Sequence, residues 1–96
     1  MYQIDNCRAW VKVAKVNGML AEVLYSYKTP VAGVLYVGES RLPFITCDAF
    51  NFSRTTSSHI SKYFYKEQFI EKCSAKMVKK AVKSGNIEVL NKIEVE

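Results

Sequence analysis

The dipeptide Asn17-Gly18, which separates two stretches of strand-forming residues, restricts the fold of this chain more than any other feature. Both residues accept the positive φ angles of a type I′ turn, which connects two antiparallel strands. Residues 8–16 (RAWVKVAKV) alternate in the period of a strand. Residues 19–27 (MLAEVLYSY) favour a returning strand, although their apolar residues also fit the spacing of a short helix. The chain is therefore predicted to begin with a β-hairpin.

Two more strands are predicted between residues 28 and 52. Proline cannot donate a hydrogen bond to a strand ladder, so we expect the pairing to break at residues 28–30, Lys-Thr-Pro. Residues 31–37 (VAGVLYV) are typical of a central strand, and residues 38–41 are expected to form a loop. Residues 42–52 (LPFITCDAFNF) form the fourth strand. Four strands with short connections predict an antiparallel meander.

The second half of the chain changes to the period of a helix. Apolar residues recur at helical spacing from about residue 56 to 66 and again from about 67 to 84, and Gly85 is expected just after the second helix. The pattern leaves open whether these are one or two helices. Residues 86–96 have the composition of a strand and would add a fifth one at an edge. The prediction is an α+β fold, one domain of residues 1–96, with an antiparallel four-stranded meander packed against one or two C-terminal helices.

The positive charge is concentrated in one segment. The chain carries a net charge of +5, yet residues 54–83 hold eight basic and two acidic side chains, a difference of +6. On the second predicted helix, five lysines fall within about a third of the circumference, and no acidic residue stands three or four positions away. We predict a basic binding surface formed by Lys72, Lys76, Lys79, Lys80 and Lys83. The alternative is an ordinary solvated face.

The sequence argues against several classes of protein. The three cysteines, Cys7, Cys47 and Cys73, stand far apart, and a zinc site needs paired ligands that one histidine cannot supply, so we expect no metal and no cofactor. An odd cysteine count without a signal peptide predicts a cytoplasmic protein with reduced thiols. No apolar run reaches membrane-spanning length, so we expect no membrane association. No set of residues is placed as a nucleophile with its base or as an acid–base pair, so we expect no enzyme activity.

Residues 53–61, SRTTSSHIS, combine six hydroxyl side chains with Arg54 and His59, the only histidine. They stand at the start of the first predicted helix, where a hydroxyl can accept from the free N–H groups, and Thr55 is our predicted N-cap. A cap does not account for six hydroxyls, or for a histidine in a first turn that disfavours cations. We favour a structural hydroxyl network, and the alternative is a pocket for an anion or polar ligand.

Two segments, residues 25–33 (YSYKTPVAG) and residues 55–61 (TTSSHIS), are notable together. They resemble a family of small phage and mobile-element proteins of unknown function. The resemblance covers about residues 25–63 and leaves the first hairpin and the basic C-terminal part outside it. On matching positions it points to Tyr25, Ser26, Tyr27, Thr29, Thr55, Thr56, Ser57 and His59. It implies that the end of the second strand lies beside the start of the first helix, with hydroxyls bonding backbone groups freed at Pro30.

These observations lead to a functional expectation. We expect a non-enzymatic phage or mobile-element protein that binds a host protein or protein–nucleic-acid complex, in the host cytoplasm. Inhibition of a host defence complex, as by an anti-CRISPR protein, is the biological form that the resemblance and the small size favour. The alternative is a DNA- or RNA-binding protein of weak sequence specificity, in which Tyr63, Tyr65 and Phe69 stack on bases beside the lysines. The oligomeric state is left open.

Overall fold

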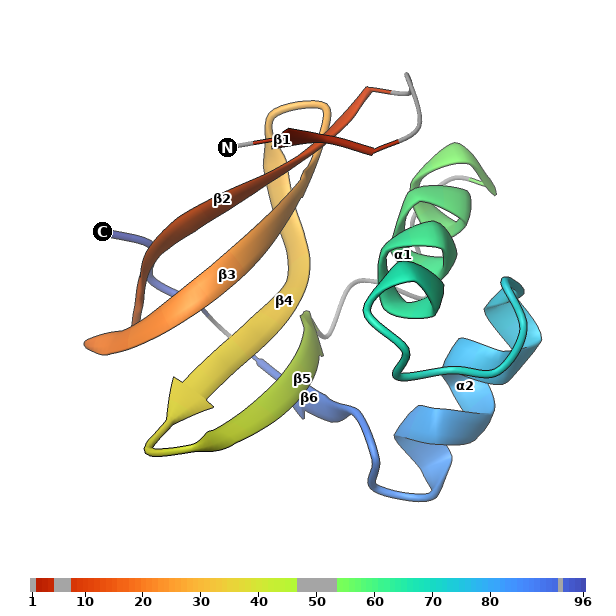
Figure 1. Cartoon of the computed structure of the whole chain (residues 1–96). Coiled ribbons are helices and arrows are strands. Elements are labelled where there is room, and N and C mark those ends of the chain that lie inside the picture. Colours follow the sequence, from red (N-terminus) through yellow and green to blue (C-terminus); the bar gives the residue numbers. More distant parts are fainter. Residues whose placement is uncertain (1, 5–7, 47–53, 92) are drawn as a thin grey trace.

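The computed structural model describes residues 2–4, 8–46, 54–91 and 93–96. Six strands form one sheet in the order of the sequence, and two helices cover one of its faces (Figure 1). The elements are β1 (Tyr2–Gln3), β2 (Ala9–Val16), β3 (Met19–Ser26), β4 (Thr29–Val37), β5 (Ser40–Thr46), α1 (Arg54–Lys66), α2 (Ala75–Lys83) and β6 (Glu88–Leu90). The predicted α+β class is confirmed, and the predicted meander corresponds to β2–β5, to which β1 and β6 are added.

The first hairpin forms as the sequence predicts. β2 and β3 pair antiparallel, with Val16 opposite Met19 across a two-residue turn. In this turn Asn17 and Gly18 have φ angles of 51° and 84°, which a type I′ turn requires. Residues 19–26 are therefore a strand and not the short helix that their spacing also allowed.

Two predicted interruptions of the sheet are wrong. The pairing of β3 with β4 continues through Pro30, which lies opposite Tyr25 beside a register shift that leaves Val31 as an extra residue. A proline near the start of a strand and next to a bulge loses no ladder bond, so it need not end the pairing. The predicted loop at residues 38–41 shrinks to a turn, because β5 begins at Ser40.

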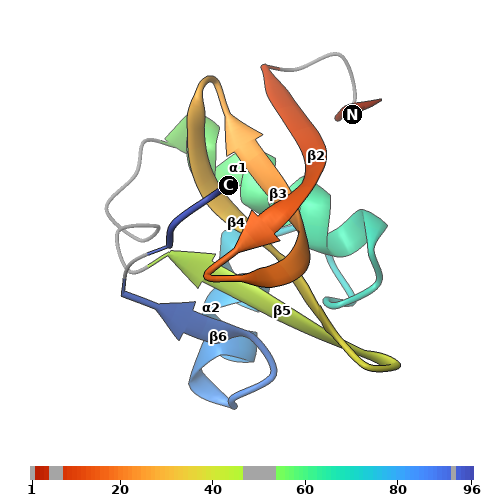
Figure 2. The same cartoon turned by 90° about the vertical axis from the view of Figure 1, so that its left-hand side faces the viewer.

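The C-terminal part of the chain joins the sheet at two places. β6 pairs with β5, and the pairing is parallel because the helices carry the chain back across the sheet before it. Beyond β6, Val95 bridges to Val16, with the N–H of Asn17 donating to the carbonyl of Glu94 at 3.0 Å. Figure 2 shows this C-terminal segment crossing the face of the sheet that is turned away from the helices. The outer edge of β2 is thus paired with β1 in one half and with the C-terminal segment in the other.

The second helix is shorter than predicted. α1 ends at Lys66, and Gln68 follows in the left-handed region with φ 66°, so residues 67–74 form a bent connection. α2 begins only after Ser74, whose side chain accepts from the N–H of Met77 at 3.2 Å. Its end is a Schellman motif, in which Gly85, at φ 87°, donates to Val82 and the following residue donates to Ala81. The predicted position of Gly85 is confirmed.

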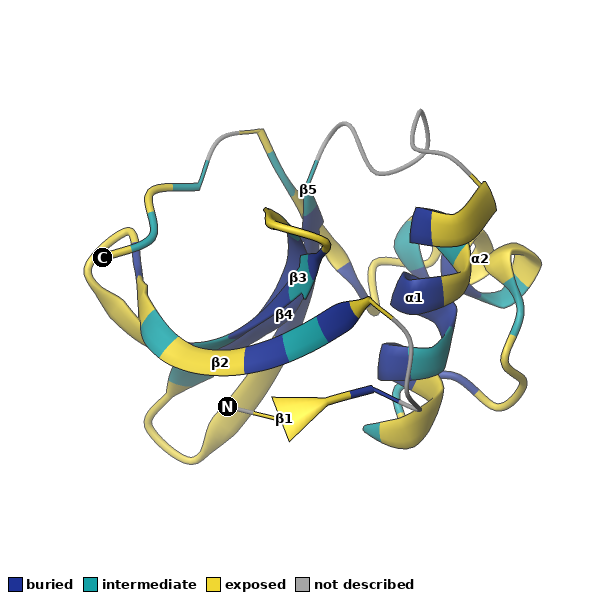
Figure 3. Ribbon diagram, turned by 90° about the horizontal axis from the view of Figure 1, so that it is seen from above, coloured by how far each residue is buried: buried dark blue, intermediate teal, exposed yellow. Residues whose placement is uncertain are grey.

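The sheet buries apolar side chains on both faces. Figure 3 shows it curved, with α1 and α2 on one side and the C-terminal segment on the other. The helix-side core is centred on Leu24, Val34, Ile60, Tyr63 and Phe64. The opposite core contains Val16, Ala21, Val23, Leu35 and Phe44, against which the C-terminal Ile93 and Val95 pack. Because the two cores lie on opposite faces, neighbouring residues of β3 point into different surroundings.

Candidate functional site

The hydroxyl-rich start of α1 lies against the end of β3, as the resemblance implied. The Ser26 hydroxyl lies 3.0 Å from the Thr56 hydroxyl and 2.8 Å from Nδ1 of His59. All three side chains are buried, with only 3% of Ser26 and of His59 exposed. We call this cluster of Ser26, Thr56 and His59 the clasp. Burial lowers the pKa of His59, and the charge of nearby Lys62 lowers it further by a smaller amount. The imidazole is therefore neutral around pH 7.

The bonds within the clasp differ from those expected. The hydroxyls bond one another and the imidazole, whereas we predicted bonds to backbone groups freed at Pro30, a break that does not occur. Thr55 as the N-cap is also wrong, since α1 already includes Arg54. Buried groups that bond one another fit the structural network better than a ligand pocket.

The other residues that were predicted for this site lie in different places. The Tyr27 ring lies beside the clasp, 5.9 Å from the ring of His59. Thr29, Arg54 and Thr55 are exposed. The carbonyl of Ser57 accepts from the hydroxyl of Ser61, and Tyr25 packs against the core on the other face of the sheet. The predicted polar cluster is therefore not one site, although its central members do meet.

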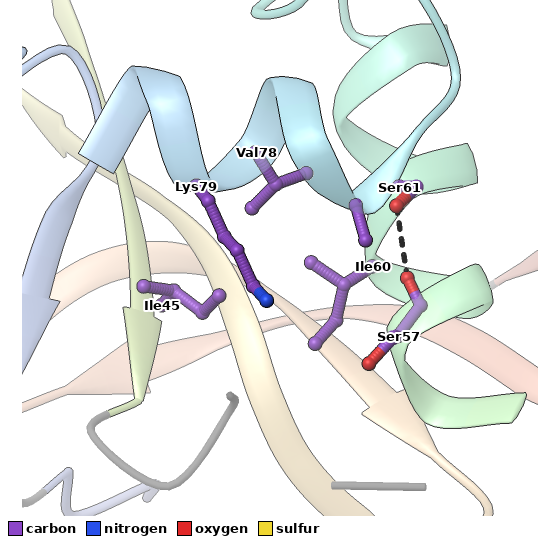
Figure 4. Close-up of a pocket in the computed structure, with 7 residues that line it drawn as sticks. Ile45, Ser57, Ile60, Ser61, Val78 and Lys79 are labelled. Carbon is purple, nitrogen blue, oxygen red and sulfur yellow. Dashed lines mark hydrogen bonds between the residues drawn. The ribbon is translucent and has the colours of Figure 1, made fainter. Parts of the chain in front are cut away.

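A small cavity lies between α1, α2 and β5. It is lined by Ile45, Ser57, Ile60, Ser61, Ala75, Val78 and Lys79. Figure 4 shows the Lys79 side chain extending from α2 toward Ile45 and Ile60. The volume is about 60 Å³, enough for a few waters but far below the roughly 300 Å³ at which ligand pockets begin. At this volume the cavity is too small for a ligand larger than a few waters.

Three of the five lysines of the predicted binding surface lie together on α2. Lys76, Lys80 and Lys83 are exposed and follow the spacing i, i+4, i+7 on α2, so they share one side of the helix. We call these three the lysine face. Lys79 stands at its margin and reaches into the cavity, and Lys72 lies in the bent connection before the helix, so neither belongs to this face.

The rest of α2 holds the lysine face in place. Val78 and Ala81 on the opposite side of the helix are buried in the helix-side core. Within the described ranges, no acidic side chain forms an ion pair with a residue of the lysine face. The aromatic residues expected beside it are arranged differently: Tyr63 is fully buried and Phe69 packs against the core, which leaves only Tyr65 exposed.

Sequence reasoning missed a carboxyl pair, Glu22 on β3 and Glu67 just after α1. The two carboxyl groups lie close enough to influence each other's pKa. Glu22 also accepts from the hydroxyls of Tyr63 at 2.9 Å and Tyr36 at 3.3 Å. Burial raises the pKa of Glu22, and the nearby Glu67 carboxylate raises it further.

Glu67 occupies the more polar side of this pair. It accepts from Arg41 at 3.0 Å and from the Tyr2 hydroxyl at 3.2 Å. Burial raises its pKa, but the interactions with Glu22, Arg41 and Tyr2 outweigh burial and leave the pKa below the usual range. No local pattern could have paired Glu22 with Glu67, because the two residues come from distant parts of the chain.

The described residues offer little else for chemistry. Cys73 is exposed, and Cys7 and Cys47 lie outside the described residues. Residues 2–4, 8–46, 54–91 and 93–96 contain no group of three or more histidine, cysteine, aspartate or glutamate side chains that could hold a metal ion. No helix in this part of the chain is long and apolar enough to cross a membrane.

Comparison with known proteins gives one match. Residues 3–79 match the model of a protein family described as "Family of unknown function (DUF8033)". The matched range contains the clasp and also the first hairpin, so it is wider than residues 25–63, over which we noted a resemblance. It ends within α2, among the lysines. No curated protein and no solved structure matches the chain.

Proposed function

This chain belongs to a family of unknown function, DUF8033, and we propose that it is a non-enzymatic binding protein whose lysine face docks on an anionic surface of a host macromolecule. The observation that carries the proposal is the geometry of α2. Three exposed lysines share one side of a helix that is capped at both ends and buried on its other side. Such a helix presents its charges at fixed positions, whereas lysines on a loose segment would lose entropy on binding.

The uncompensated charge supports a binding role. Like charges three or four positions apart on a helix destabilise it by a few tenths of a kcal/mol per pair. Lys76, Lys80 and Lys83 meet no acidic partner among the described residues that would offset this cost. An anionic surface would remove the repulsion on contact and would also accelerate association at low salt.

We further propose the biological setting that the resemblance of residues 25–33 and 55–61 suggests. The protein would act in the cytoplasm of a bacterial host after entry of a phage or mobile element. Its partner would be a host protein or a protein–nucleic-acid complex, and inhibition of a defence complex is the outcome we favour. The second candidate is direct binding of DNA or RNA through the same lysines, since phosphate groups suit them equally well.

Affinity purification from a bacterial extract, with and without nuclease, tests these proposals. We expect partners that survive nuclease treatment and are lost when Lys80→Glu and Lys83→Glu are combined. The matched control combines Arg8→Glu and Lys15→Glu, two exposed residues on or next to β2 that change the charge equally. Partners that vanish with nuclease would instead indicate the second candidate. If both variants retained the same amount of the partners, the lysine face would be an ordinary solvated surface.

A further inference from the structure

The face of the sheet that is turned away from the helices carries a second feature, near the turn between β3 and β4. A shallow hollow of about 310 Å³ lies there, formed by three aromatic and two basic side chains. They are Trp10, Lys12, Tyr25, Tyr27 and Lys28. We call this set the aromatic platform. It is separate from the lysine face, which lies on α2 on the helix side of the sheet.

The strand period explains why these side chains gather. Ser26 points to the helices and enters the clasp, so its neighbour Tyr25 must point to the opposite face. Trp10 lies directly opposite Tyr25 in the pairing of β2 with β3, which places both rings on that face. Lys12, two residues after Trp10, also points there.

The turn completes the aromatic platform. Tyr27 has a φ of 59°, and its N–H donates to the carbonyl of Arg8 at 2.7 Å, which fixes the turn against the start of β2. Its ring contacts the clasp residue His59 on one side and is 50% exposed. Lys28 follows it and is exposed. The buried clasp therefore supports the end of the hairpin on which the aromatic platform is built.

Exposure and charge indicate what this surface can bind. Trp10 and Tyr25 are half-buried, so their rings are held in position and still reach the surface. Tyr25 packs on the core beneath it. Lys12 and Lys28 are exposed, and no acidic side chain of the described residues lines the hollow.

We propose that the aromatic platform binds single-stranded nucleic acid. Unpaired bases expose flat rings that stack on tryptophan and tyrosine, and the phosphates that connect them would pair with Lys12 and Lys28. An acidic peptide would use only the lysines, and a duplex keeps its bases stacked inside. This inference does not depend on the lysine face of α2.

Fluorescence offers a readout that reports on this site alone, because Trp10 is the only tryptophan of the chain. We would titrate the protein at low salt with oligomers of about ten thymidylates or uridylates, and with a DNA duplex of equal length. Single strands are expected to quench Trp10, and comparison of the DNA and RNA oligomers shows which sugar is preferred. Combining Lys12→Gln and Lys28→Gln is expected to reduce the slope of log K against log salt by about 1.4, at about 0.7 for each phosphate that a lysine no longer neutralises.

Variants of the rings test the stacking itself. Tyr25→Leu is expected to weaken binding of the thymidylate oligomer about tenfold. Because Tyr25 also packs on the core, a second variant, Tyr27→Asn, removes an exposed ring while asparagine tolerates the positive φ. Its expected loss of affinity is about fivefold, and a cooperative melting transition at a somewhat lower Tm, because the ring also contacts His59, shows that the variant is folded.

The proposal is overturned by any of three results. The first is that neither the thymidylate nor the uridylate oligomer quenches Trp10. The second is that the duplex and heparin quench Trp10 as strongly as the single strands do. The third is unchanged affinity in a folded Tyr27→Asn variant. The variant that combines Lys80→Glu and Lys83→Glu should bind the oligomers about as well as the wild type apart from a general charge effect. It thereby separates failure of the aromatic platform from failure of the proposed lysine face.

Discussion

Helix α1 is linked to strand β3 by polar side chains at both of its ends, and the two links differ in character. At the start of the helix, Ser26 bonds Thr56 and His59 in the clasp. Near its end, Glu22 bonds Tyr63. The clasp is buried and neutral, whereas the second link holds a carboxyl pair that is only partly buried. A fully enclosed polar cluster has to be neutral and completely bonded, but partial contact with water allows a charge to remain.

The largest expected effect is removal of the clasp. His59→Ala leaves the Ser26 hydroxyl without its imidazole partner and opens a cavity beneath the ring of Tyr27. We expect a loss of about 3 kcal/mol in the free energy of unfolding. For a domain of this size, the loss corresponds to a fall in Tm of about 15 °C, measurable by calorimetry.

The control for this prediction is a neighbouring hydroxyl. Ser58 is exposed on the same turn of α1, and Ser58→Ala should change stability by less than about 0.5 kcal/mol. If His59→Ala kept the wild-type Tm but no longer bound a partner, the cluster would be a ligand site and not a clasp.

The two links are expected to respond to pH in opposite directions. The pKa of His59 is lowered from 6.5, so below that pH the unfolded chain binds more protons than the folded one, and stability falls with acidification. The pKa of Glu22 is raised from 4.5, so above that pH the folded chain binds more protons. The contribution of Glu22 is therefore lost as the pH rises through its folded pKa. Glu67, with a lowered pKa, loses its contribution only below pH 4.5.

Glu22→Gln separates these effects, because an amide can donate to Glu67 and accept from Tyr63 without titrating. We expect the variant to gain stability relative to the wild type as the pH rises from 5 to 8, a smaller change than that of His59→Ala. Urea unfolding of both proteins at four or five pH values measures the difference in their free energies of unfolding. The titration of His59 cancels from this difference because both proteins contain His59. A difference that does not depend on pH would mean that folding does not raise the pKa of Glu22.

The smallest expected effect concerns the exposed side of the carboxyl pair. The ion pair between Arg41 and Glu67 spans 3.0 Å, with 45% of the arginine side chain exposed. Arg41→Met should cost about 0.5 kcal/mol at low salt and less at high salt, because water and ions screen such pairs. Urea midpoints at two salt concentrations measure this change. A loss above about 2 kcal/mol would show that Glu67 depends on Arg41 to hold its charge.

Local patterns predicted much of the fold. Asn17-Gly18 predicted the first turn, and Gly85 predicted the end of α2, because each residue determines the backbone beside it. The parallel pairing of β6 and the bridge from Val95 to Val16 depend on the path of the whole chain, which no local signal describes. α2 was predicted too long because the apolar spacing continues through residues 67–74, where the left-handed Gln68 bends the backbone.

In the candidate sites too, some features follow from local sequence patterns and others depend on the fold of the whole chain. The contact of Ser26 with His59 could be anticipated only through the resemblance that joined their two segments. The shared side of Lys76, Lys80 and Lys83 followed from helical spacing alone. The pairing of Glu22 with Glu67, and the position of Trp10 opposite Tyr25, required the three-dimensional arrangement of the strands and of the connection after α1.

The pairing of β2 with two remote segments has a consequence for synthesis on the ribosome. Until residues 94–96 have left the ribosome and paired with it, the half of β2 around Lys15 lacks the partner that the described residues give its outer edge. An open edge of this kind can recruit strands from other nascent chains. Deletion of residues 91–96 would expose this edge, so it should lower soluble yield more than the length of the deleted segment suggests.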